Sequence, residues 1–166
     1  MITIKYFKEI TFVYAIFISL FHFGVNIWGG ISDLWFNSAH FALLASLGFL
    51  TYEASKEENK VSILNLIFAV LSLSTFFYMI LFEESLYAVA NSQMRMSDLI
   101  VSGMTIALAT IMVKKSTGYI IPGIIVFCIA YLLFLGQHFE GVFAFGGMSY
   151  ERFLYRMFYT SEGLFG

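Results

Sequence analysis

The chain has 166 residues, of which 60% are hydrophobic and 12% are charged, and its mean hydropathy is +0.83. This balance is far from that of a soluble domain, so the composition indicates an integral membrane protein. A formal net charge of -2 and scattered basic residues offer no basic surface for nucleic acid. The sequence has a single cysteine, Cys128, which excludes both an internal disulfide and a cysteine metal cluster.

Five apolar segments approach the roughly 20 residues that an α-helix needs to cross a bilayer core. They run from Ile10 to Trp28, Leu34 to Tyr52, Val61 to Phe82, Leu99 to Val113 and Tyr119 to Phe139. The fourth segment is short, and it gains a turn if it begins at Met94. The sequence therefore predicts an all-α, polytopic integral membrane protein with about five transmembrane helices.

The distribution of positive charge in the short loops favours a cytoplasmic N-terminus, because cytoplasmic loops carry an excess of lysine and arginine. With that orientation the inner side holds six basic residues: Lys5, Lys8, Lys56, Lys60, Lys114 and Lys115. The outer side holds Arg95, Arg152 and Arg156. Five crossings then place the C-terminus outside, whereas a fifth segment that re-enters the membrane would reverse this placement.

Residues 149 to 166, SYERFLYRMFYTSEGLFG, follow the 3.6-residue period of an amphipathic helix. The predicted apolar face carries Tyr150, Phe153, Leu154, Met157, Phe158, Leu164 and Phe165. The predicted polar face carries Glu151, Arg152, Tyr155, Arg156, Tyr159 and Glu162. Ser149 is the predicted N-cap, and the helix is expected to lie flat at the membrane interface.

Arg152 and Arg156 are four residues apart, so they share one face of this helix and repel each other. An anionic lipid headgroup or an acidic partner surface would neutralise both charges. We therefore expect lipid or partner docking at these arginines, with a merely interfacial helix as the alternative.

Two pairs of polar residues lie within the predicted spans. His22 and Asn26 are four residues apart in the first span, and Asn37 and His40 are three apart in the second, so each pair shares a helix face. The pairs can meet across the short GGISD connection, where interhelical hydrogen bonds contribute about 1 kcal/mol or less. Two alternatives remain: His22 and His40 bind a haem, or these groups mark an ion or proton path.

The C-terminal part of the chain resembles a known transporter family. Residues 119 to 166, YIIPGIIVFCIAYLLFLGQHFEGVFAFGGMSYERFLYRMFYTSEGLFG, look like the junction of the fused permease of TAXI-type tripartite ATP-independent periplasmic (TRAP) transporters. In that family, a hydrophobic helix that begins with a proline is followed by a loop that contains glycine. A short helix with one or two arginines comes next, and then an element similar to TSEGLFG. The upstream residues that keep the family's order are Asp98, Lys114, Lys115, Gly118 and Pro122.

The likeness extends over residues 94 to 166. Residues 1 to 93 match mainly as hydrophobic segments, with AHFALLASLGFLTY around His40 resembling an early helix of the family. Ile111 is a departure, because many members have an acidic residue just before the basic pair. The role of that carboxylate therefore does not transfer to this chain.

The resemblance implies how the chain is divided and what it does. Residues 1 to 113 would form a Q-like four-helix scaffold, and residues 114 to 166 would begin an M-like transport domain that is truncated here. The complete machine would be a secondary active importer of the bacterial inner membrane that receives solute from a periplasmic solute-binding protein. It would use an ion gradient, with sodium as the expected ion, and the solute and sodium sites would lie in the large M-like domain beyond Gly166.

The sequence itself offers no catalytic, cofactor or metal site. It has no GxxxxGK[ST] loop that would cradle a nucleotide phosphate, and it does not bring a nucleophile, a base and an orienting group together. A non-transporting membrane scaffold or assembly protein is the alternative function. A redox membrane enzyme is a third hypothesis, which depends on the haem alternative at His22 and His40.

Overall fold

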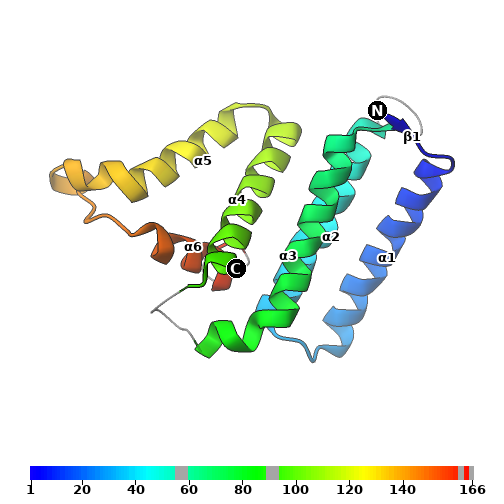
Figure 1. The fold of residues 1–166 in the computed structure, drawn as a ribbon, viewed down its shortest axis with the longest axis horizontal. Coiled ribbons are helices and arrows are strands. Elements are labelled where there is room, and N and C mark those ends of the chain that lie inside the picture. The colour runs from blue at the N-terminus through cyan, green and yellow to red at the C-terminus, as the bar shows by residue number, and fades with distance from the viewer. Residues whose placement is uncertain (55–59, 89–93, 161–162, 165–166) are drawn as a thin grey trace. The chain divides into compact units, whose positions relative to one another are not determined.

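The computed structural model describes residues 1 to 54, 60 to 88, 94 to 160 and 163 to 164, and these residues are almost entirely helical (Figure 1). The α-helices are α1 (Phe7–Trp28), α2 (Asp33–Ala54), α3 (Ile63–Ala88), α4 (Met96–Thr117), α5 (Ile120–Ala130) and α6 (Tyr150–Tyr159). The predicted all-α fold is confirmed. The predicted loop positions around Lys56, and Glu162 and Phe165 of the predicted C-terminal helix, lie outside the described residues.

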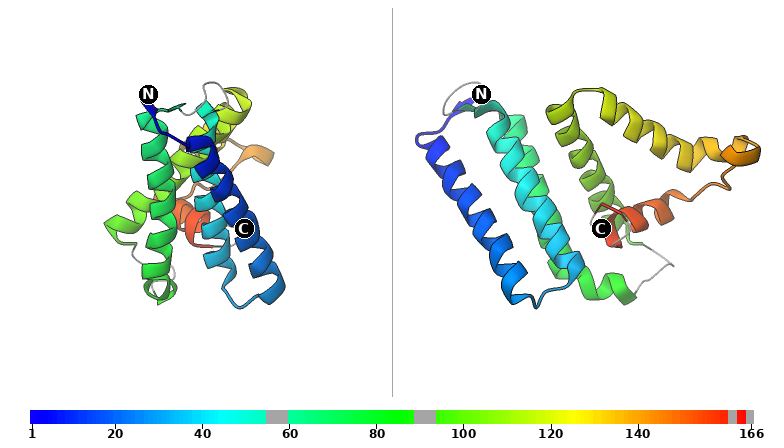
Figure 2. Two further views of the ribbon diagram at one scale, coloured as in Figure 1. Left: turned by 90° about the vertical axis from the view of Figure 1, so that its right-hand side faces the viewer. Right: turned by 180° about the vertical axis from the view of Figure 1, so that it is seen from behind.

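The chain forms two compact units, Met1–Glu83 and Glu84–Gly166. In the first unit α1, α2 and α3 lie side by side, as Figures 1 and 2 both show. The boundary of the compact units does not coincide with the expected division after Val113, because α4 packs with α5 and α6. The division into Q-like and M-like parts concerns family relationship, and it stays a prediction.

A short two-stranded sheet ties the N-terminus to the chain before α3. Strand β1 (Ile2–Thr3) pairs antiparallel with β2 (Lys60–Val61), and Ile2 lies opposite Val61. We expected Val61 to begin the third helix, but the helix begins at Ile63. Backbone pairing with a segment some 60 residues away in sequence takes Val61 out of the helix.

Small residues line the buried face of α2. Ala39 and Ala42 are fully buried, and Ser38 and Ser46 are also inaccessible. Such residues let neighbouring membrane helices approach closely. Phe49 closes this interface against Phe68 of α3, with ring centroids 5.2 Å apart.

In the second unit α5 leaves the end of α4 at an open angle, and α6 lies across the opening (Figure 1). Gly118 makes the turn between α4 and α5 possible because its φ of 80° is one that side-chain-bearing residues rarely adopt. Its N–H also donates to the carbonyl of Lys114 at 3.0 Å and so ends α4.

The fifth span, predicted from Tyr119 to Phe139, covers Ile120–His138 in the structure and is not one uniform α-helix. After α5 the chain continues through a π-helical turn (Tyr131–Leu135) and a 3-10 turn (Gly136–His138). The following loop folds back on this end, where the Phe145 N–H donates to the Gly136 carbonyl at 3.0 Å. A Cβ atom at Gly136 would lie 2.7 Å from the Phe145 Cβ, so the close return of the loop requires glycine.

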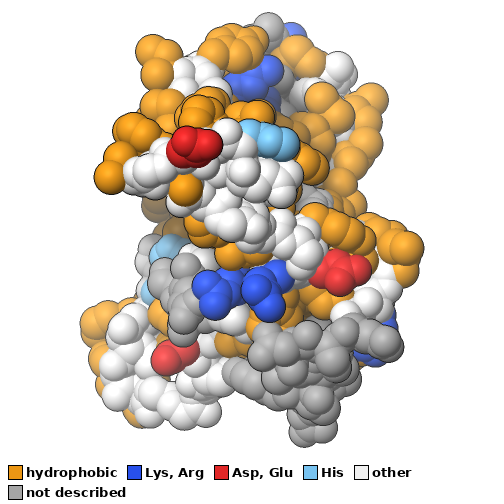
Figure 3. Space-filling model, turned by 90° about the vertical axis from the view of Figure 1, so that its left-hand side faces the viewer, with side chains coloured by type: hydrophobic (Ala, Val, Ile, Leu, Met, Phe, Trp, Pro, Cys, Tyr) orange, Lys and Arg blue, Asp and Glu red, His pale blue; other side chains and the backbone are white. Residues whose placement is uncertain are grey.

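Five helical stretches are long and apolar enough to cross a membrane: Phe7–Trp28, Asp33–Tyr52, Ile63–Phe82, Met96–Thr117 and Ile120–His138. In each of these stretches, no more than 33% of the most apolar 18-residue segment is buried inside the protein. Large side chains such as Phe12, Leu20 and Phe127 are exposed, and hydrophobic side chains cover much of the surface seen in Figure 3. Because a lipid bilayer is the environment that such surfaces require, the chain is a multi-pass membrane protein.

Candidate functional site

A histidine pair joins the first two helices. The Nε2 atom of His22 on α1 lies 2.7 Å from the Nδ1 atom of His40 on α2. The other ring nitrogen of His22, Nδ1, lies 2.7 Å from the carbonyl oxygen of Ile18. Because a carbonyl only accepts, Nδ1 of His22 carries a proton, and neutral His22 accepts through Nε2 from His40. In this arrangement Nε2 is the unprotonated nitrogen of each ring, and Nε2 of His40 is the one that lies outside the bond between the two rings.

Aromatic rings hold this pair in place. Phe21 and Phe36 both meet the His22 ring edge to face, with centroids 5.5 Å and 5.4 Å away. The two imidazole rings are themselves nearly perpendicular, at 77°. His22 is half-buried and His40 is exposed, so the pair lies at the outer edge of the α1–α2 hairpin.

The two asparagines predicted to share a helix face with the histidines are Asn26 and Asn37. Asn26 donates through Nδ2 to the carbonyl of His22 at 2.7 Å, so this contact stays within α1. Asn37 is half-buried on α2. Of the four residues singled out from the sequence, the structure thus brings His22 and His40 together across two helices and turns Asn26 back onto its own helix.

The geometry of the pair is that of a shared hydrogen bond. Two imidazole nitrogens that bind a haem iron from opposite sides would stand roughly 4 Å apart, because a metal–nitrogen bond is about 2.0 Å long. The observed 2.7 Å separation between the nitrogens does not fit the haem alternative. No group of three or more potential metal ligands occurs among the described residues.

A second hydrogen bond between α1 and α2 was not predicted from the sequence. The Tyr14 hydroxyl on α1 lies 2.7 Å from the Ser46 Oγ on α2. In an antiparallel hairpin, the residue numbers of any two facing residues add to nearly the same value. The pair His22 and His40 and the pair Tyr14 and Ser46 both satisfy this rule. The expected meeting of the histidines therefore carried the signal for this contact.

The predicted amphipathic helix is present as α6, and Ser149 caps it as expected. The helix is shorter than predicted, because it ends at Tyr159 and Leu164 lies in a turn beyond it. The Ser149 hydroxyl accepts from the backbone N–H of Arg152 at 3.3 Å. Arg152 and Arg156 are exposed, whereas Phe153 and Phe158 are buried. The apolar face of α6 packs against α4 within the same unit, and a position at the membrane interface stays a prediction.

Two tyrosines of α6 depart from their predicted faces. Tyr159, expected on the polar face, is buried, and its hydroxyl donates to the backbone carbonyl of Asp98 at 3.4 Å. Tyr150, expected on the apolar face, is 51% exposed. A tyrosine can be buried when its hydroxyl finds an acceptor, and helical periodicity alone does not reveal that acceptor.

Asp98 joins the start of α4 to α6. Its carboxylate is 1% exposed and accepts from the backbone N–H of Arg95 at 2.8 Å, with the Arg95 Nε at 3.4 Å. Its carbonyl accepts from Ser102 as well as from Tyr159. Asp98 is thus the N3 residue of a capping box in which Arg95 is the N-cap of α4, and it is also a contact point for α6.

No family model matches the chain, and comparison with curated proteins and with solved structures gives no significant match.

Proposed function

We propose that the chain is a membrane component of a TRAP-type secondary active solute importer in a bacterial inner membrane. In this proposal it works with a periplasmic solute-binding protein and an ion gradient, without ATP. This portion braces a large M-like transport domain or subunit, and that domain binds the solute and the sodium ion.

One observation carries the proposal: the order of elements in residues 94 to 166. A membrane-capable stretch, Ile120–His138, has Pro122 near its start and is followed by a glycine-containing return loop. A short helix capped by Ser149 and bearing Arg152 and Arg156 comes next. The same order characterises the junction in the family that the sequence resembles.

A scaffolding role is supported by how the polar groups of the first unit are used. The His22–His40 and Tyr14–Ser46 contacts each join α1 to α2. Buried hydroxyls such as Ser72 and Thr75 donate to carbonyls of their own helix, α3. The two contacts between α1 and α2 stabilise the helix bundle, whereas the hydroxyls of α3 are satisfied within their own helix. The same observation favours the alternative function, a non-transporting membrane scaffold or assembly protein.

Two measurements together test the proposal. The first is the mass and composition of the native species, purified from membranes in mild detergent through a tag at the N-terminus. The proposal expects the chain to occur with an M-like region of many apolar helices, either in one polypeptide or as a bound subunit.

The second measurement is uptake of a panel of labelled organic anions in cells with and without the gene. The proposal expects gene-dependent uptake that stops when an ionophore collapses the sodium gradient and persists when ATP is depleted. An 18.9 kDa species without such a partner, together with unchanged uptake, would support the scaffold instead.

A further inference from the structure

The second unit contains an apolar cavity of about 340 Å³ between α4, α5 and α6. Its walls include Ile106 and Val113 of α4, Ile125 and Ile129 of α5, and Phe153 and Met157 of α6. The volume is at the lower end of the roughly 300–1,000 Å³ of small-molecule sites. A single hydrocarbon chain fits such a space better than a bulky ligand does.

The cavity offers no polar group to a ligand. Thr110 lines it, but the Thr110 hydroxyl donates to the carbonyl of Ile106 at 2.8 Å within α4. Cys128 and Met157, the two lining residues with a sulfur atom in their side chains, behave as hydrophobic residues and are at most weak hydrogen-bonding groups. Water in such a space would lack hydrogen-bond partners, so hydrocarbon is the favoured occupant.

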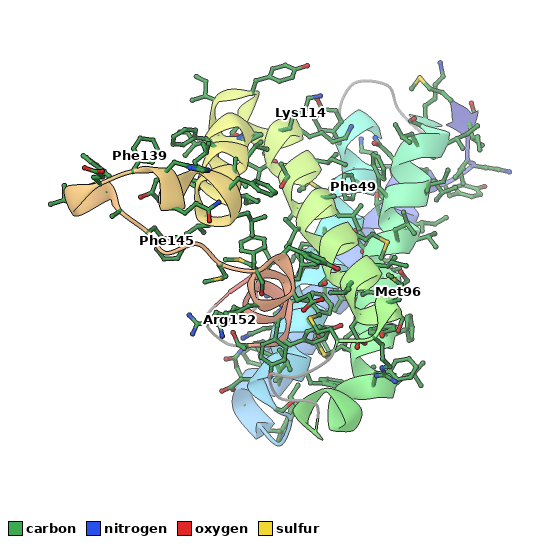
Figure 4. The ribbon with its side chains drawn as sticks, turned by 60° about the vertical axis from the view of Figure 1, so that its left-hand side comes forward. Phe49, Met96, Lys114, Phe139, Phe145 and Arg152 are labelled. Carbon is green, nitrogen blue, oxygen red and sulfur yellow. The ribbon has the colours of Figure 1, made fainter. Side chains whose placement is uncertain are left out.

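Helix α6, which contributes two wall residues to this cavity, also carries two basic side chains. Arg152 and Arg156 each directly precede a wall residue, Phe153 and Met157 respectively, and both arginines are exposed. Figure 4 shows Arg152 pointing outward from α6. The planar guanidinium group binds phosphate through two parallel hydrogen bonds, and a shared anion relieves the repulsion between cations four residues apart.

We propose that this unit binds one anionic phospholipid, with an acyl chain in the cavity and the headgroup phosphate at Arg152 and Arg156. The combination of a purely apolar cavity and a flanking pair of cations matches the two parts of such a lipid. A zwitterionic lipid would fill the cavity equally well but would bring its own cation to the arginines. The proposal does not depend on the transport function.

The test measures lipid retention by native mass spectrometry of the purified full chain. The probes are phosphatidylglycerol and phosphatidylcholine with the same acyl chains. Wild type is expected to retain phosphatidylglycerol more strongly. The double variant Arg152→Gln/Arg156→Gln is expected to weaken phosphatidylglycerol retention by about fivefold for each arginine removed and to abolish the preference.

A matched control removes two basic residues from the first unit. Lys5→Gln/Lys8→Gln changes the net charge by the same amount and is expected to keep the wild-type preference. Filling the cavity with Ala109→Phe is expected to reduce retention of both lipids. Val113→Phe, a second filling variant, serves the same purpose if the first does not fold by circular dichroism.

Three results would overturn the proposal. The first is wild-type retention of phosphatidylglycerol by the arginine double variant. The second is undiminished lipid retention by the folded cavity-filling variants. The third is a lipid-free wild-type dimer that Ala109→Phe dissociates, which would assign the cavity to a second copy of the chain.

Discussion

Replacing Asp98 by alanine should destabilise the second unit, because this carboxylate is buried and caps α4. Loss of an N-terminal cap costs about 1 kcal/mol, and leaving the backbone N–H of Arg95 without its 2.8 Å partner adds desolvation of about 1–3 kcal/mol. The ion pair adds little, since the Arg95 side chain is 44% exposed. We expect a total loss of about 2–4 kcal/mol.

Thermal unfolding in detergent, followed by far-ultraviolet circular dichroism, measures this loss. For a chain of this length 1 kcal/mol corresponds to about 2–4 °C, so Asp98→Ala should lower the midpoint by about 4–16 °C. Asp98→Asn retains an oxygen that can accept from Arg95 and should lose less than half as much. Asp33→Ala is the matched control, because Asp33 lies in the first turn of α2 and is exposed.

The control isolates the part of the effect that comes from burial and capping. An exposed first-turn carboxylate contributes about 0.3–1 kcal/mol through the helix dipole. Asp33→Ala should therefore lower the midpoint by about 4 °C at most. If Asp98→Ala lowered it no further than Asp33→Ala does, the argument from the buried cap at Asp98 would be refuted.

Three further experiments with the same thermal assay test other contacts. Gly136→Ala should destabilise the protein by about 1–3 kcal/mol, because the new methyl group meets Phe145. The control Gly103→Ala has open space around it and should be neutral or stabilising. Equal effects of the two substitutions would contradict the steric explanation. Asn65→Leu should raise the midpoint, because the buried Asn65 amide nitrogen has no hydrogen-bond partner among the described residues; a lower midpoint would show that the amide is needed. His22→Phe should cost about 0.6 kcal/mol, and His40→Phe in that background should add little if the histidine pair is the interaction lost.

The sequence by itself determined that the chain is helical and spans a membrane. Apolar runs of about 20 residues have few alternatives to a membrane helix, because a bilayer leaves backbone groups no partners except those within the helix. Local rules also sufficed for α6, where a 3.6-residue period and Ser149 as the N-cap identified the helix and its start. The meeting of His22 with His40 followed from a short connection between adjacent helices.

Contacts between distant segments were decided only by the tertiary structure. The β1–β2 pairing that ends at Val61 and the burial of Tyr159 against the Asp98 carbonyl each need a partner that no local window contains. The return of Phe145 onto Gly136 and the apolar cavity likewise depend on how α4, α5 and α6 meet. Hydrophobicity and period specify which residues form a helix, whereas the partner of a buried polar group or the space between helices exists only once the helices have packed.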